Sequence, residues 1–222
     1  MKKGEKKFYD IWILLAVFLL LLVITGGAWY LSSEKTENIA EGEQTAEEQA
    51  AVISRNSPLT EYVRLSPNAT VPREEKITKI TIHHMAADLS LEEAGRLFAD
   101  TDREASANYG IDSEGRIGLY VEEKNRAWSS ANPDNDARAV TIEVADDEIG
   151  GDWHVSEEAY DALIELCTDI CRRNDISKLV YTGNAEGNLT MHKMFDSGTE
   201  CPGEYLESRM GEIAKAVNQR LQ

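Results

Sequence analysis

The stretch ITKITIHH, residues 77–84, decides the fold. Its β-branched residues predict a strand, and alternation along that strand places the isoleucines on one face and His83 on the other. A second strand is expected at VTIEV, residues 140–144, where the apolar residues share one face and Glu143 projects from the opposite one. If the two strands are neighbours, His83 and Glu143 project from the same polar-leaning face of a sheet.

Helices and further strands surround this pair in the sequence. Ser90 and Glu93 form a capping box that opens a short helix, and Ser156 caps a longer helix with one apolar face. The other expected elements are strand-like runs at residues 108–112 and 116–122 joined by a hairpin turn, a short strand at 178–181, and a closing amphipathic helix from Tyr205. This mixture predicts an α/β fold, a single mixed β-sheet flanked by helices.

A loop-like stretch, TMHKMFDSGTECPG at residues 190–203, places His192 nine residues before Cys201. Imidazole and thiolate are ligands that zinc favours, and a loop can bring both to one point. Together with His83 they make three protein ligands and leave the fourth tetrahedral position open, which is typical of a catalytic zinc. A carboxylate such as Glu143 is costly to bury unless it meets a cation or lines a cleft. These residues predict hydrolysis of an amide or ester, with Glu143 transferring the proton.

The other histidines and cysteines have structural interpretations. A histidine at a strand end is usually structural, and His84 is expected to face the core, whereas His154 precedes a helix in a turn. Cys167 and Cys171 are four residues apart on an expected helix, so their Cβ atoms are about 5–6 Å apart, whereas a disulfide needs about 3.8 Å. We expect both to be free, buried thiols, which leaves Cys201 as the unpaired cysteine available for chemistry.

Five segments follow one another along the chain: TIHHMA around His83, SANYGIDSEGRI from Ser106, AWSS around Trp128, VTIEV around Glu143, and MHKMFDSGTECPG. In these segments and their order the chain resembles the zinc-dependent N-acetylmuramoyl-L-alanine amidases, a family that includes phage T7 lysozyme and the peptidoglycan recognition proteins. The resemblance implies that His83, His192 and Cys201 bind Zn²⁺. It also implies that Glu143 is catalytic and that the substrate is the amide bond between N-acetylmuramic acid and L-alanine in peptidoglycan.

Two positions depart from the family's pattern. The catalytic tyrosine of some members corresponds to Ala107, and Tyr109 two residues later is no straightforward replacement, so Glu143 must carry the proton transfer. A lysine that stabilises the oxyanion in some members corresponds to Thr199. We expect Thr199 or a backbone N–H to assist the metal in that role. Trp128 is expected either to line the substrate groove or to pack against the hairpin.

The N-terminal region differs in character from the rest of the chain. Residues 1–10 contain four lysines, and residues 11–31 are an unbroken apolar run long enough to span a bilayer. Because the lysines keep that end in the cytoplasm, we expect a single-pass transmembrane signal anchor in the cell membrane, with the C-terminal domain extracytoplasmic in a bacterial envelope. The alternative is a signal peptide cleaved near residues 25–27, but the run exceeds the roughly 7–15 apolar residues of such peptides.

The next segment, residues 32–60, is rich in glutamate and poor in large apolar residues. Such a composition predicts an acidic flexible linker with at most a transient helix near residues 46–52, followed by the amidase domain at residues 61–222. The formal net charge of −17 argues against a nucleic-acid partner. We expect a monomer whose partners are peptidoglycan and the membrane.

Two rival functions remain at this point. One is a non-catalytic peptidoglycan-binding module of the same fold, for which loss of a zinc ligand, typically the cysteine, is expected. The other is a structural zinc domain, which requires a fourth protein ligand such as His84 or Asp196.

Overall fold

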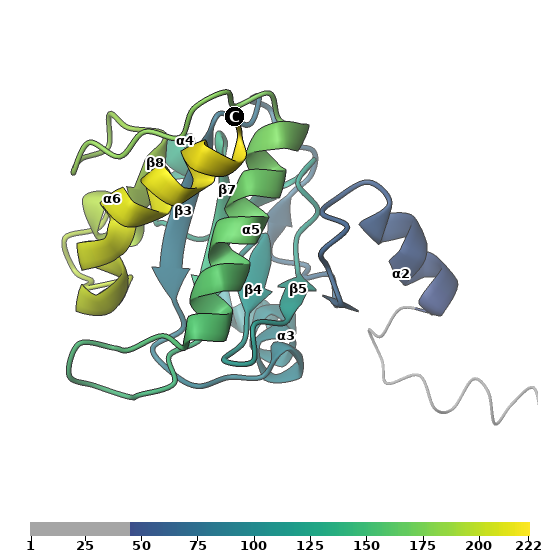
Figure 1. The fold of residues 1–222 in the computed structure, drawn as a ribbon. Helices are drawn as coiled ribbons and strands as arrows, with labels where there is room; N and C mark the ends of the chain where they lie inside the picture. Colours follow the sequence, from purple (N-terminus) through teal and green to yellow (C-terminus); the bar gives the residue numbers. More distant parts are fainter. Residues whose placement is uncertain (1–44) are drawn as a thin grey trace, which may run out of the picture. The chain divides into compact units, whose positions relative to one another are not determined.

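The computed structural model describes residues 45–222, and their ribbon is drawn in Figure 1. Six strands form one sheet in the order β1-β5-β4-β7-β3-β8, with parallel pairs except for the antiparallel β4–β5 hairpin. The bounds are β1 Tyr62–Val63, β3 Lys79–His84, β4 Tyr109–Ile111, β5 Ile117–Leu119, β7 Ala139–Val144 and β8 Leu189–Met191. A second, two-stranded sheet pairs β2 (Ala69–Thr70) with β6 (Arg126–Ala127). The expected mixed sheet is confirmed.

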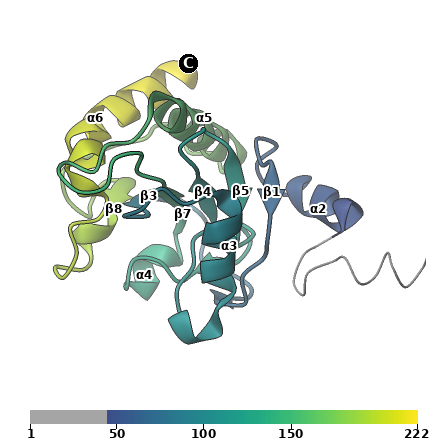
Figure 2. The same cartoon turned by 90° about the horizontal axis from the view of Figure 1, so that it is seen from below.

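Helices cover both faces of the six-stranded sheet (Figure 2). One face carries the two long helices, and the other carries two short ones, so the sheet lies between two helical layers. The long helices are α5 (Glu157–Arg173) and α6 (Gly203–Arg220), and the short ones are α3 (Leu91–Ala99) and α4 (Pro133–Asp136). The expected capping box of α3 is present, and Ser156 Oγ accepts a hydrogen bond from the backbone N–H of Ala159 at the start of α5.

The main hydrophobic core lies between the sheet and the long helices. Ile82 and Ile142 are register partners in the parallel β3–β7 pair, and both are fully buried. Cys167 and Cys171 lie in the same core as free thiols, which confirms that expectation. The apolar faces predicted from strand alternation therefore face α5 and α6, and the opposite face is left for the polar residues.

The folded unit begins earlier than the expected boundary at residue 61. A helix, α2 (Ala46–Ile53), opens with a capping box between Thr45 and Glu48, and Val52 is only 5% exposed within the main core. Beyond it, the backbone N–H of Ser57 donates to the hydroxyl of Tyr109 at 3.0 Å. The composition of this segment did not indicate the attachment, because tertiary contacts by a few residues are enough to hold a short helix.

The expected strand at residues 178–181 does not form. Val180 O instead accepts the backbone N–H groups of Asn188 and Leu189, and the Asn188 side chain accepts from Val180 N, so this segment closes a local turn. The strand that forms in this part of the chain is β8, which pairs with β3 in parallel. It includes Thr190, which the sequence had placed at the start of a loop. Its register is supported by the contact between the hydroxyls of Thr81 and Thr190 at 3.0 Å.

Replacing Tyr109 by phenylalanine should destabilise the fold by about 1–3 kcal/mol without changing catalysis. Its buried hydroxyl donates to Glu123 at 2.7 Å and accepts from Ser57, and both partners would lose a hydrogen bond. Urea unfolding measures the loss, with Tyr160→Phe on a more exposed part of α5 as the control. A fall in kcat without a fall in stability would show that Tyr109 acts in the reaction after all.

Within residues 45–222, no helix is long and apolar enough to cross a membrane. The expected basic segment, the expected anchor at residues 11–31 and the first part of the expected linker lie outside the described residues.

Candidate metal and catalytic site

The site lies where three parallel strands end. His83 is the fifth residue of β3 and Glu143 is its direct register partner on β7. His192 follows the last residue of β8, which flanks β3 on the other side. Because the carboxyl ends of neighbouring parallel strands meet at one edge of a sheet, these three side chains converge there. The prediction that His83 and Glu143 share a face is confirmed.

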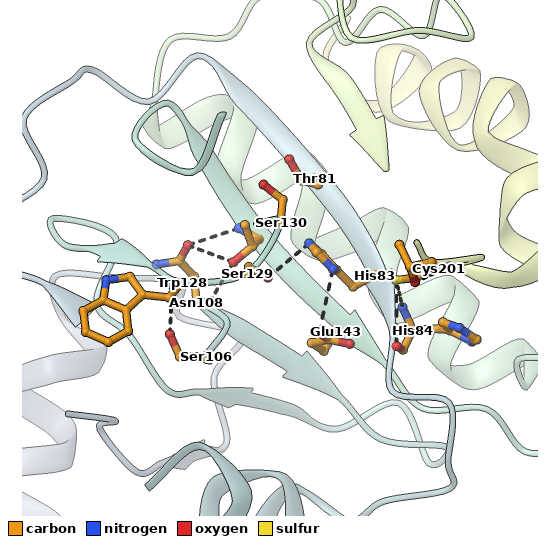
Figure 3. Close-up of polar contacts among 12 residues, drawn as sticks. Thr81, His83, His84, Ser106, Asn108, Trp128, Ser129, Ser130, Glu143 and Cys201 are labelled. Carbon is orange, nitrogen blue, oxygen red and sulfur yellow. Dashed lines mark hydrogen bonds and ion pairs between the residues drawn. The ribbon is translucent and has the colours of Figure 1, made fainter. Parts of the chain in front are cut away.

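Cys201 joins this group from the segment before α6. Ligand atoms of His83, His192 and Cys201 all lie within 4.8 Å of one another, and the two imidazole rings are 4.8 Å apart between centroids. Figure 3 shows His83 between Glu143 and Cys201. Two imidazoles and one thiol within this spacing are a donor set that suits zinc.

The two nitrogens of His83 have different surroundings. Its Nε2 lies 3.1 Å from Ser129 Oγ, and its Nδ1 lies 3.9 Å from Glu143 Oε1. The ring is only 1% exposed. Since Ser129 occupies the Nε2 side, Nδ1 is the nitrogen that remains for a metal ion.

The remaining polar atoms of the cluster also fit a cation. Within residues 45–222, neither His192 Nε2 nor Glu143 Oε2 has a hydrogen-bond partner, although both atoms are buried. Burial lowers the pKa of His83 well below its ordinary value and lowers that of His192 less strongly, so both imidazoles are neutral and free to ligate. Burial, followed by the charge of Glu143, raises the pKa of the Cys201 thiol. A divalent cation bound here would favour the charged forms of Cys201 and Glu143, which burial disfavours.

The segment that carries Cys201 is held by backbone contacts to both other ligand-bearing elements. Lys193, next to His192, donates its backbone N–H to Cys201 O at 3.0 Å, and the backbone N–H of His84 points at Cys201 Sγ at 3.4 Å. Gly203 then turns the chain into α6 with φ +81°, and a Cβ there would lie 2.8 Å from Trp153. Only glycine fits this approach without displacing its neighbours.

Thr199 lies in the same segment and lines a pocket of about 260 Å³ together with Glu143 and Cys201. Its hydroxyl accepts the backbone N–H of Cys201 at 3.1 Å, which leaves the hydroxyl proton available for a second partner. The hydroxyl is therefore a hydrogen-bond donor held beside the candidate ligands.

The pKa of Glu143 is shifted toward the physiological range. Its side chain is 18% exposed, and burial raises its pKa to about 8; Arg103 opposes this rise and Asp146 adds to it. Arg103, on the 3₁₀ turn Thr101–Arg103, lines the same pocket. A carboxyl group in this position can both accept and donate a proton near neutral pH.

Two pockets meet at His192. The one lined by Thr199 extends along α3, where Leu97 and Phe98 form an apolar wall. The other, about 380 Å³, is lined by Trp128, Arg126 and polar residues around α4. The Trp128 indole N–H donates to Thr70 at 3.0 Å, so the ring both lines this pocket and is fixed by the small sheet.

Several other candidates do not join the ligand cluster. His84 faces away from His83 and its Nδ1 lies 2.9 Å from Asp146, while its ring packs against Trp153. Asp196 lines the Trp128 pocket instead. Among the described residues, the group that could hold a metal ion therefore has three members, His83, His192 and Cys201, and neither His84 nor Asp196 belongs to it.

Two residues at the site were missed from the sequence. Ser129 contacts His83, but it lies between β6 and α4, where no periodicity reports which way a side chain points. Its only signal was its place in the AWSS segment. Arg103 is a single cation in a polar turn and carried no signal at all.

Comparisons with known proteins agree with this fold. Solved structures that resemble the chain include PlyL (19% identity, TM-score 0.55, covering 70% of this chain and 95% of that one) and the catalytic domain of XlyA (17%, 0.54, 70% and 97%). A derivative of AmpD also matches, at 19% identity and TM-score 0.50 over 72% of this chain and 93% of that one. A comparison with curated proteins found no match. A family model described as N-acetylmuramoyl-L-alanine amidase matches residues 73–204.

Proposed function

Because the chain belongs to the N-acetylmuramoyl-L-alanine amidase family, we propose that it hydrolyses the amide bond between N-acetylmuramic acid and L-alanine in peptidoglycan, and that it uses zinc. The observation that carries the proposal is the convergence of His83, His192 and Cys201 within 4.8 Å, with Glu143 beside them. Three protein ligands leave room for a reacting group, which a closed structural site lacks.

The residues would divide the work as follows. Zinc held by the two imidazoles and the thiolate would polarise the scissile carbonyl and lower the pKa of a water molecule to about 7. Glu143 would accept the proton of the attacking water and deliver it to the leaving amine of L-alanine. Its position as the register partner of His83, with one oxygen lacking a protein partner, supports this role.

Thr199 would donate a hydrogen bond to the oxyanion. Replacing it by valine should lower kcat by roughly 10²-fold, the cost of one oxyanion donor, while Thr199→Ser should retain most of the activity. Steady-state kinetics on a soluble muramyl-peptide measures both. An unchanged kcat in Thr199→Val would assign the oxyanion to the metal and backbone alone.

The rival is a peptidoglycan-binding module that does not cut. It is less well supported, because this chain keeps the three ligand residues together and adds a carboxylate with a raised pKa. We also propose, from the sequence, that residues 11–31 anchor the chain in the cell membrane with residues 45–222 on the outer side.

The test is digestion of purified cell walls by the full chain, with zinc content measured on the same sample. We expect turbidity to fall and new L-alanine amino termini to appear, both abolished by a chelator and restored by zinc. Zinc bound at one ion per chain with no new L-alanine termini would support the binding module instead.

A further inference from the structure

The side chain of Ser129 contacts Nε2 of His83. Its Oγ lies 3.1 Å from Nε2, whereas Glu143 lies 3.9 Å from the other ring nitrogen, Nδ1, and Figure 3 marks both contacts. The His83 ring is 1% exposed, so solvent cannot serve as an alternative partner for Nε2. Whether Nε2 carries the proton of the neutral ring therefore depends on Ser129.

This contact bears on which tautomer His83 adopts. A neutral imidazole carries its proton on one nitrogen only, and a nitrogen that ligates a metal must present its lone pair. If Nδ1 is to ligate, Nε2 must hold the proton and needs an acceptor. A serine oxygen can accept that hydrogen bond.

Ser129 is itself held in place by a buried carboxylate. Its backbone N–H donates to Asp136 Oδ2 at 3.0 Å, and the next residue, Ser130, donates its backbone N–H at 3.1 Å and its hydroxyl at 2.5 Å to the same side chain. Asp136 is 2% exposed and caps this turn from α4. The hydroxyl that meets His83 thus sits on a backbone with little freedom to move.

The preceding residue, Trp128, connects the same turn to the Trp128 pocket. The backbone N–H of Trp128 donates to Ser106 Oγ at 3.1 Å, and its ring lines the pocket that meets the metal site at His192. Trp128 and Ser129 are consecutive, so the turn places a pocket wall and a contact to a metal ligand in one rigid segment.

We propose that Ser129 is a positioning residue that fixes His83 in the tautomer with the proton on Nε2 and the lone pair of Nδ1 directed at the metal position. This inference rests on the proposed function, since it concerns the zinc that the enzyme would use. Ser129 also lines the Trp128 pocket, but in this role it acts through His83. Partners that orient a metal-bound histidine commonly contribute 10–100-fold to metal affinity.

The experiment compares Ser129→Ala and Ser129→Thr with the wild-type full chain in two measurements. Competition with a chromophoric chelator gives zinc affinity, and ¹H–¹⁵N correlation spectra of ¹⁵N-histidine-labelled, metal-free chain give the tautomer of each ring. Four histidines in the chain keep these spectra assignable. Ser57→Ala is the matched control, because it removes another buried serine hydroxyl that accepts a hydrogen bond, from Leu59, away from the site.

We expect Ser129→Ala to bind zinc about 10-fold more weakly and to lose the Nε2-protonated form of His83 as the dominant one. Its activity should recover when zinc is in excess. Ser129→Thr should resemble the wild type, and Ser57→Ala should keep wild-type affinity even if it is less stable. Wild-type affinity and an unchanged His83 tautomer in Ser129→Ala would overturn the proposal.

The two proposals fail in different ways. A wild-type chain that binds no zinc would remove the proposed function, yet the tautomer of the metal-free chain would still report on Ser129. A chain that binds zinc and cuts peptidoglycan, but whose His83 tautomer ignores Ser129, would leave the function standing and reject the positioning role.

Discussion

Replacing Glu143 by alanine should lower kcat for amide hydrolysis by about 10²–10⁴-fold while zinc stays bound. The carboxylate lies 3.9 Å from His83 Nδ1 and is outside the three-member ligand cluster, so its loss removes the proton acceptor without removing a ligand. Rates on a soluble muramyl-peptide and zinc content of the same sample measure the two effects separately.

The isosteric change Glu143→Gln sharpens this test, because it keeps the volume of the side chain and removes only its ability to accept a proton. Glu158→Gln, on the exposed side of α5, is the control for loss of one carboxylate. Full activity in Glu143→Gln would show that another group carries the proton, and it would leave the amidase assignment intact.

Replacing Cys201 by alanine should abolish zinc binding at micromolar zinc, and activity with it. Cys201 is the sole thiol of the cluster, and two neutral imidazoles alone form a weak site for zinc. A ligand that binds only the folded state raises the unfolding temperature, so added zinc should stabilise the wild type and leave Cys201→Ala unchanged. Thermal melts with and without zinc therefore detect the loss without any substrate.

Cys171→Ala provides the matched control for this change. Cys171 is also a free and buried cysteine, but it lies in the core on α5. Its replacement should lower stability through a small cavity and keep the zinc-dependent rise in melting temperature. A zinc-dependent rise in Cys201→Ala equal to that of the wild type would remove this cysteine from the ligand set.

The alternation of side chains along the strands was the sequence pattern that predicted the site best. It placed His83 and Glu143 on one face because the period of a strand is fixed by backbone geometry, and the β3–β7 register then made them direct partners. Helix ends at Ser90 and Ser156 were predictable for a similar reason, since capping depends on side chains a few residues apart.

What escaped prediction depends on contacts between distant residues. β8 has only three residues and exists because it pairs with β3, so its own composition carried too little signal. The contact of Ser129 with His83 joins residues 46 positions apart, across a turn without periodicity. The attachment of α2 depends on Val52 and on the bond from Ser57 to Tyr109, which an acidic, polar composition conceals.

The early start of the folded unit shortens the stretch of chain between that unit and the proposed anchor. Thirteen residues, 32–44, separate the proposed anchor, which ends at residue 31, from the first described residue, Thr45, whereas the sequence predicted a linker of 29 residues, 32–60. Even fully extended, thirteen residues span at most about 45 Å, against about 100 Å for 29. If residues 11–31 anchor the chain as proposed, a connection of at most about 45 Å would keep the site near the membrane and favour the wall layers closest to it.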